Sequence, residues 1–187
     1  MKLYLIRHGE SETNRIACWT GWLDAKLTDK GLCDAELAGK ALLGIKFDKV
    51  YSSDLERARR TAEIALPGCE YEATPLLREI SLGELEGKPI ASVTPEIRET
   101  LKDGYASIGG ESVSMFRTRI VEFLKKMEEL PYENVAAFSH GGWLTSALSV
   151  VFDLDLPRKN IYCGNCAILT LTYTNGTWRL YGWQNVT

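Results

Sequence analysis

Two histidines that each follow an apolar run are the residues with the clearest capacity for chemistry. The chain contains two in total: His8 follows the run 3–6, and His140 follows the run 135–138. Apolar runs of this length are typical of buried strands, and the carboxyl ends of parallel strands are where α/β sheets bind ligands. The spacing therefore predicts one site built from two distant segments. Arg7, beside the first histidine, indicates that the site handles an anion.

A second arginine and a glycine fit the same anion. Arg57 stands in the first turn of a predicted helix, just after the run 48–52, and Gly141 opens a helix directly after His140. An arginine offers paired donors that match phosphate oxygens, and the amides at a helix N-terminus add partial positive charge. Arg7, Arg57 and His140 therefore point to a pocket for a phosphoryl group.

His8 is the better nucleophile of the two histidines. We expect it at the end of its strand, with Gly9 leaving space in front of it. A neutral imidazole nitrogen can attack phosphorus and form a covalent intermediate. Neighbouring positive charges disfavour the imidazolium form and stabilise the negative phosphoryl oxygens.

An alkoxide that leaves phosphorus needs a proton, and the segment 77–87 carries three carboxylates in a glycine-bearing stretch. One of them could act as the general acid and later as the base that activates water. Composition alone leaves Glu79, Glu84 and Glu86 open for this role.

Apolar periodicity predicts the elements that position these groups. Strands are predicted at 2–7, 48–52, 69–73 and 134–139, and helices at 28–43, from a Ser53 capping box to Pro67, at 111–129 and at 141–152. Residues 166–173 and 177–183 form a predicted hairpin around Asn175-Gly176. This alternation predicts one α/β domain over residues 1–187. It is a three-layer sandwich with a mostly parallel sheet, helices on both faces and a C-terminal antiparallel hairpin.

Composition excludes several classes of function. A net charge of −3 over 187 residues argues against a nucleic-acid or anionic-membrane partner, which would need a basic excess. The first apolar run is too short for a signal peptide or a membrane span, so we expect a cytoplasmic protein. Five cysteines indicate free thiols. Cys163-x-x-Cys166 could be half a zinc site or a redox pair, but it lacks a second pair nearby, and small buried residues are the favoured interpretation.

The motifs resemble a known family. Residues 5–14, Leu-Ile-Arg-His-Gly-Glu-Ser-Glu-Thr-Asn, closely resemble the signature of the histidine phosphatase superfamily, which includes the cofactor-dependent phosphoglycerate mutases. Further blocks follow in the family's order, at 20–24, 27–31, 51–62, 77–80 and 139–142. The resemblance covers nearly the whole chain and implies a phosphoglycerate mutase-like fold.

The resemblance also implies roles for individual residues. His8 would be the phosphorylated nucleophile, Glu79 the proton donor, and Arg7, Arg57 and His140 the phosphate pocket. Glu86 matches a motif position that we do not interpret as catalytic. The implied substrate-binding residues are Asn14, Thr20, Gly21 and Gly141. The partner would be a small phosphorylated metabolite, and the family needs no metal; we expect no cofactor.

The chain departs from the mutase pattern after the acid loop. Mutases of this family carry a long insertion there, with extra basic residues, whereas 23 residues separate Gly87 from Glu111. Leu82 replaces a tyrosine expected in the mutase loop. Residues 109–112, Gly-Gly-Glu-Ser, resemble the small phosphatase branch, which includes α-ribazole phosphatase and broad-specificity phosphatases. We therefore expect hydrolysis of a phosphomonoester, with α-ribazole 5′-phosphate as one candidate.

Two alternatives stay open. The block Gly21-Trp22-x-Asp24 is shared with phosphoglycerate mutases, and a non-catalytic member could bind a phosphorylated ligand. Trp19 and Trp22 either line an aromatic entrance suited to a bulky leaving group or pack beneath the loop.

Overall fold

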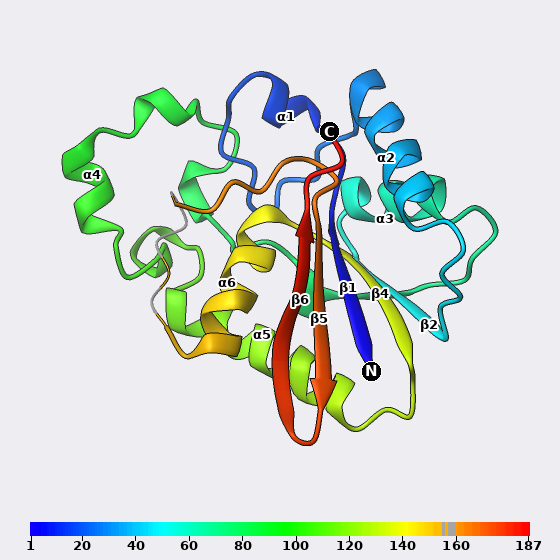
Figure 1. Ribbon diagram of the computed structural model, residues 1–187. Helices are drawn as coiled ribbons and strands as arrows, with labels where there is room; N and C mark the ends of the chain where they lie inside the picture. The colour runs from blue at the N-terminus through cyan, green and yellow to red at the C-terminus, as the bar shows by residue number, and fades with distance from the viewer. Residues whose placement is uncertain (155, 157–159) are drawn as a thin grey trace.

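Six strands form one sheet in the order β3-β2-β4-β1-β5-β6 in the computed structural model, which describes residues 1–154, 156 and 160–187 (Figure 1). The strands are β1 (Lys2–Arg7), β2 (Lys49–Ser53), β3 (Glu72–Thr74), β4 (Asn134–Ser139), β5 (Ile168–Thr174) and β6 (Thr177–Gln184). The first four in that order pair in parallel, while β5 pairs antiparallel with both of its neighbours, β1 and β6. The predicted mixed sheet and its terminal hairpin are confirmed.

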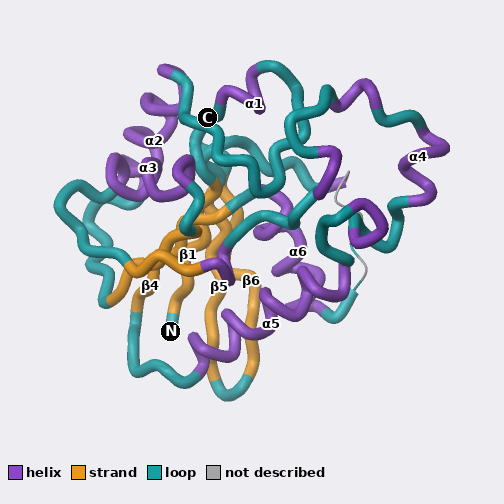
Figure 2. Tube along the Cα trace, turned by 180° about the vertical axis from the view of Figure 1, so that it is seen from behind, coloured by secondary structure: helices purple, strands orange, loops and turns teal. Residues whose placement is uncertain are grey.

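Helices cover both faces of this sheet. They are α1 (Glu12–Arg15), α2 (Asp29–Ala41), α3 (Glu56–Ala65), α4 (Pro95–Thr100), α5 (Val113–Glu128) and α6 (Gly141–Phe152). In the two opposite views, α2 and α3 lie on one side of the strands and α5 and α6 on the other (Figures 1 and 2). The predicted three layers are therefore present. No described helix is long and apolar enough to cross a membrane.

Successive side chains of β1 point to opposite faces of the sheet and so contribute to both apolar clusters. Leu3 and Leu5 belong to the apolar cluster beneath α5 and α6, whereas Ile6 belongs to the cluster beneath α2 and α3. All three side chains are fully buried. A strand buried on both faces reads as a continuous apolar run, which is the pattern of residues 3–6.

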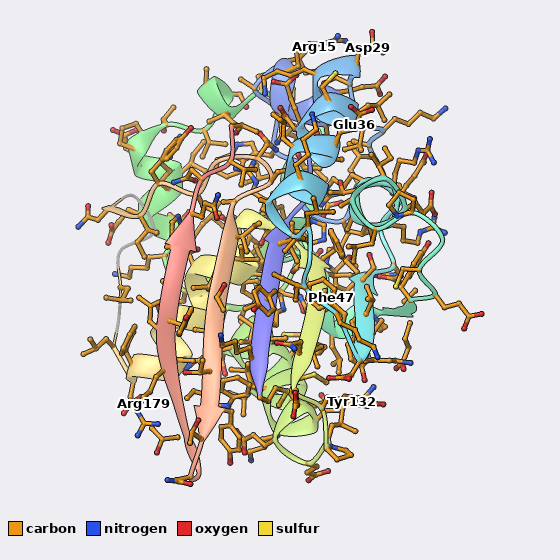
Figure 3. The ribbon with its side chains drawn as sticks, turned by 45° about the vertical axis from the view of Figure 1, so that its right-hand side comes forward. Arg15, Asp29, Glu36, Phe47, Tyr132 and Arg179 are labelled. Carbon is orange, nitrogen blue, oxygen red and sulfur yellow. The ribbon has the colours of Figure 1, made fainter. Side chains whose placement is uncertain are left out.

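Strand register brings the two histidines to one edge. Arg7 pairs with Ser139 across the parallel β1 and β4, and the His8 amide donates to the Ser139 carbonyl at 2.9 Å. Figure 3 shows the two ends of the sheet. Arg15 and Asp29 lie at the end where β1 stops, and Tyr132 and Arg179 lie at the other end.

The predicted Ser53 capping box is wrong. Helix α3 begins at Glu56, with Leu55 at the N-cap and no capping side chain of its own. Asp24, from a distant loop, accepts the Glu56 amide at 2.7 Å. The Ser53 hydroxyl instead lies 2.9 Å from His140 Nε2. A tertiary contact therefore supplies the cap and leaves the serine for the site.

Other boundaries shift by a few residues. The strand predicted at 69–73 is the three-residue β3, and the helix predicted from 111 starts at Val113, because the Ser112 hydroxyl accepts the Met115 amide as its N-cap. Helices α1 and α4 and several short 3₁₀ turns between β3 and α5 were not predicted from the sequence.

Candidate active site

His8 is buried at the carboxyl end of β1, with 4 % of its surface exposed. Its Nδ1 lies 2.7 Å from the Gly9 carbonyl oxygen. Because a carbonyl only accepts, Nδ1 carries the ring proton, and Nε2 of the neutral ring keeps its lone pair. Burial, with the positive charges of Arg57 and Arg7, lowers the pKa of His8 well below its usual value. The ring is thus held as a neutral nucleophile.

Arg57 lies directly in front of that lone pair. Its Nε donates to His8 Nε2 at 3.3 Å, while Nη2 donates to the Gly21 carbonyl at 2.8 Å and Nη1 to the Leu23 carbonyl at 3.0 Å. The side chain is 1 % exposed, and this burial lowers its pKa to about 10, which leaves it charged at neutral pH. Each terminal nitrogen carries a second N–H that can bind a phosphate oxygen.

His140 and Arg7 lie beside Arg57 and His8 and complete the group of phosphate-binding candidates. The ring of His140 is fully buried, 5.1 Å from that of His8 between centroids, and burial together with Arg57 lowers its pKa well below normal. Arg7 donates through Nη1 to the Cys163 carbonyl. His140 Nδ1 and Arg7 Nε are two of the four buried side-chain nitrogens without a partner among the described residues; the other two belong to Trp19 and Arg59. Such groups are costly unless a ligand completes them.

Glu79 approaches the same cavity from the loop after β3. Its Oε2 accepts the Gly142 amide at 2.8 Å, and its Oε1 accepts the Ile80 amide at 3.0 Å. A Cβ at Gly142 would lie 2.3 Å from Oε1, so the glycine is what lets the carboxyl group reach the start of α6. Glu79 is therefore anchored to the helix that follows His140.

The other two acidic candidates take no part in the cavity. Glu84 is exposed in a 3₁₀ turn. Glu86 Oε1 accepts the backbone amides of Trp22 at 2.8 Å and Leu82 at 3.0 Å, which makes it a brace between two loops. Of the three carboxylates left open by composition, Glu79 alone lines the cavity.

A cavity of about 630 Å³ opens over these groups. All four residues implied as substrate-binding line it, namely Asn14, Thr20, Gly21 and Gly141. Its outer wall is apolar and aromatic, with Trp19, Leu82, Tyr105 and Tyr162. Trp19 therefore lines the entrance, whereas Trp22 packs behind it and donates its indole N–H to the Glu79 carbonyl at 2.7 Å.

The expected role of Gly9 is wrong. A Cβ there would lie 2.3 Å from the Gly31 carbonyl oxygen, so the glycine permits close packing of β1's exit loop on α2. It does not line the cavity. Its amide donates to the Thr61 hydroxyl at 3.0 Å, which ties the loop to α3.

Three residues that support the site escaped the sequence analysis. Ser53 faces His140, Thr61 receives the Gly9 amide, and Asn165 Nδ2 donates to the His8 carbonyl at 3.2 Å and to Asn14 Oδ1 at 3.3 Å. Ser53 and Thr61 stand inside the block 51–62, which matches the family pattern. Their position in that block was the sequence signal that could have identified them. Asn165 had none.

The cysteines and the acidic residues build no second centre in the part of the chain that the structure describes. All five cysteines are free, and burial raises the pKa of Cys163 to about 11 and that of Cys166 to about 12, so both remain thiols. No group of His, Cys, Asp and Glu among the described residues is arranged to hold a metal ion.

Comparison with known proteins identifies the family of the chain. The family model of the histidine phosphatase superfamily (branch 1) matches residues 3–186. A relative from Salmonella paratyphi A, named a probable phosphoglycerate mutase, is 32% identical over 193 residues, covering 98% of this chain and 90% of its own.

Two solved structures share the architecture. A phosphoserine phosphatase from Entamoeba histolytica superimposes with a TM-score of 0.87 at 25% identity, covering 99% of this chain and 97% of its own. The α-ribazole phosphatase from Shigella flexneri gives a TM-score of 0.87 at 23% identity, covering 100% and 97%, which shows the shared fold.

The chain belongs to the histidine phosphatase superfamily, branch 1. The resemblance in its motifs, the expected phosphoglycerate mutase-like fold and the enzyme class of a histidine phosphatase are confirmed at this level.

Proposed function

We propose that this protein hydrolyses a small phosphomonoester through a phosphohistidine on His8. The observation that carries the proposal is the unprotonated His8 Nε2, fixed by the Gly9 carbonyl on one side and faced by Arg57 Nε at 3.3 Å on the other. A neutral, oriented imidazole beside a guanidinium is suited to attack phosphorus while the new charge is stabilised.

In the first step, His8 Nε2 forms a bond to phosphorus as the bond to the ester oxygen breaks. Glu79, in its carboxylic acid form, gives its proton to the leaving alkoxide. Arg57, Arg7, His140 and the Gly141 amide hold the phosphoryl oxygens. The buried Arg7 Nε and His140 Nδ1, which lack partners among the described residues, are groups that a phosphate would complete.

In the second step, water attacks the phosphohistidine and the bond between phosphorus and His8 Nε2 breaks. The Glu79 carboxylate takes the proton from the water and returns to the acid form. Inorganic phosphate leaves, and no proton or electron is left over. The arginines supply the positive charge for both steps, so we expect a chelator to leave the rate unchanged.

The cavity wall favours a leaving group with apolar or aromatic character. Trp19, Leu82, Tyr105 and Tyr162 surround the space beyond the phosphate clamp. Within the described lining, Arg7, Arg57 and Glu79 are the charged residues, and all three belong to the clamp and the acid. α-Ribazole 5′-phosphate, which carries a flat aromatic base, is therefore our first candidate substrate.

Phosphoglycerate mutase activity is the second candidate, because the relative from Salmonella paratyphi A carries that name. Interconversion of phosphoglycerates stimulated by 2,3-bisphosphoglycerate would favour it, and release of phosphate alone would count against it.

The test is a panel of phosphomonoesters with purified protein, read as released phosphate. Brief exposure to radiolabelled substrate and denaturation should then trap acid-labile, base-stable phosphate on His8. The proposal fails if no ester on the panel is hydrolysed or if the label sits on another residue. A protein that binds the esters but releases no phosphate and retains no label after denaturation would be a phosphate binder instead.

A further inference from the structure

Arg119, on α5, gathers the backbone of the acid loop around one guanidinium. Its Nη1 donates to the carbonyls of residues 75, 76 and 78 at 3.1–3.2 Å, and its Nη2 donates to the Glu79 carbonyl at 3.1 Å. Carbonyls of the 3₁₀ turn Pro75–Leu77 and of the two residues that follow it thus share one donor group. The segment between β3 and the 3₁₀ turn at Gly83–Leu85 has no sheet ladder to fix it.

Glu111 holds that guanidinium in place. Its Oε1 accepts Arg119 Nε at 2.8 Å and its Oε2 accepts Nη2 at 2.7 Å, in the two-pronged geometry of a strong charged pair. Both side chains are largely buried, 16 % and 8 % exposed. Glu111 Oε2 also accepts the Ser81 amide at 2.9 Å. The pair therefore binds the backbone before Glu79, at the Arg78 carbonyl, and after it, at the Ser81 amide.

Trp22 supplies a second donor to the Glu79 carbonyl oxygen, which already accepts from Arg119 Nη2. Its indole N–H reaches the Glu79 carbonyl at 2.7 Å, opposite a carboxyl group that already binds the Gly142 and Ile80 amides. The Arg119 guanidinium lies 5.9 Å from the centre of the Trp22 ring. The backbone of Glu79 is thereby fixed from α5 and from the 20–24 loop at once.

We propose that Arg119, held by Glu111 and assisted by Trp22, is the positioning residue that aims the Glu79 carboxyl group at the leaving oxygen. This inference rests on the proposed function, in which Glu79 is the general acid. Arg119 does not line the cavity, so its effect on the reaction passes through the Glu79 backbone. A misplacement of about 1 Å can cost about 100-fold in rate.

A defect in aiming an acid has a specific signature. An ester with an alkoxide leaving group needs the proton, whereas p-nitrophenolate leaves without one. The ratio kcat/KM reports the steps up to formation of the phosphohistidine. It is therefore independent of the later hydrolysis of phosphohistidine, which is the same for all substrates. Displacement of Glu79 should therefore lower kcat/KM for benzyl phosphate and spare p-nitrophenyl phosphate, two esters of similar size. General loss of structure would lower both.

The experiment compares Arg119→Lys with wild type on these two esters, and uses Glu79→Gln to set the full size of the effect. Lysine keeps the charge but loses the planar fork that spans the four carbonyls. We expect kcat/KM for benzyl phosphate to fall about 10- to 100-fold and that for p-nitrophenyl phosphate by less than about 3-fold.

Trp22→Phe provides a second variant that removes one N–H and keeps an aromatic ring. It should shift the same ratio by about 3- to 10-fold. Its matched control is Trp178→Phe on β6, where the lost indole N–H bonded to Glu128 at 2.8 Å, far from the cavity. This control should leave both rates unchanged, and thermal unfolding is measured for every variant.

The outcomes separate the two ideas. If Glu79→Gln discriminates between the esters but both Arg119→Lys and Trp22→Phe lower the two rates equally or leave both unchanged, the positioning role is wrong and the proposed function stands. If the wild type hydrolyses neither ester nor any other on the panel, the proposed function and this inference fall together. A selective loss in Arg119→Lys or, should that variant misfold, in Trp22→Phe supports the positioning role.

Discussion

The two halves of the candidate site are held in place by different means. His8 and His140 stand at the ends of adjacent parallel strands, and the bond from the His8 amide to the Ser139 carbonyl continues the sheet ladder into the site. Glu79 lies in an irregular loop whose carbonyls are bound by side chains of Arg119 and Trp22. The phosphate half is thus fixed by main-chain pairing, and the acid half by side chains that a single substitution can remove.

Replacement of His8 should give the largest loss, because it removes the proposed nucleophile at the end of β1. We expect His8→Asn to lower kcat/KM at least about 10⁴-fold for every ester, whatever its leaving group. The labelled phosphohistidine should disappear, while urea unfolding shows a folded protein. Retention of acid-labile label in this variant would contradict the assignment.

Arg57→Lys tests the phosphate half without removing a charge. Lysine cannot reach the Gly21 and Leu23 carbonyls and a phosphate together, so we expect kcat/KM to fall about 100- to 1000-fold for all esters. Arg60→Lys, three residues along the same helix at an exposed pair with Glu63, is the matched control and should be silent. Little or no loss in Arg57→Lys would mean that the charge at this position, and not the guanidinium fork, matters.

Gly142→Ala tests the acid half from the side of α6. The added methyl group would meet the Glu79 carboxyl group at 2.3 Å and displace it, so we expect about a 10-fold loss on benzyl phosphate and a smaller one on p-nitrophenyl phosphate. Gly182→Ala, where nothing lies within 4 Å of the new Cβ, is the control. Equal losses on both esters would show that the phosphate half had moved instead.

The smallest expected effect is on stability against pH. Burial lowers the pKa of His8 and His140 in the folded protein, so below about 6.5 the unfolded chain binds protons that the folded protein does not. The free energy of unfolding should therefore fall as pH drops through 6.5, until the lowered folded pKa values are reached. Urea unfolding at several pH values should show a weaker dependence in His140→Gln. An unchanged slope would contradict buried, neutral histidines.

The phosphate half was readable from the sequence, and the acid half was not. Apolar runs before His8 and His140 predicted strands, and parallel strands align their ends, so the convergence of the two histidines followed from periodicity. Composition could not choose Glu79 over Glu84 and Glu86. In the structure the Glu79 carbonyl meets Arg119, forty residues away, and no local period records such a contact. The resemblance selected Glu79, which is the one of the three that lines the cavity.

The failed Ser53 capping box has the same origin. The capping-box residues are present in the sequence, but Asp24 from another loop caps α3, and the Ser53 hydroxyl contacts His140. Likewise, Gly9 and Gly142 look alike in the sequence. One accommodates the backbone of Gly31 and the other the Glu79 carboxyl group, and only the tertiary structure separates them.

The place of β1 in the sheet has a consequence for how the chain acquires its activity. Its two neighbours are β4 and β5, so during synthesis β1 finds its partners only after residues 134–174 have been made. Until then, the apolar run 3–6 of β1 precedes His8 with both strand edges unpaired, a state prone to aggregation. Pairing at such sequence separation is slow. Fragments that end before β4 should therefore carry His8 and yet have no site.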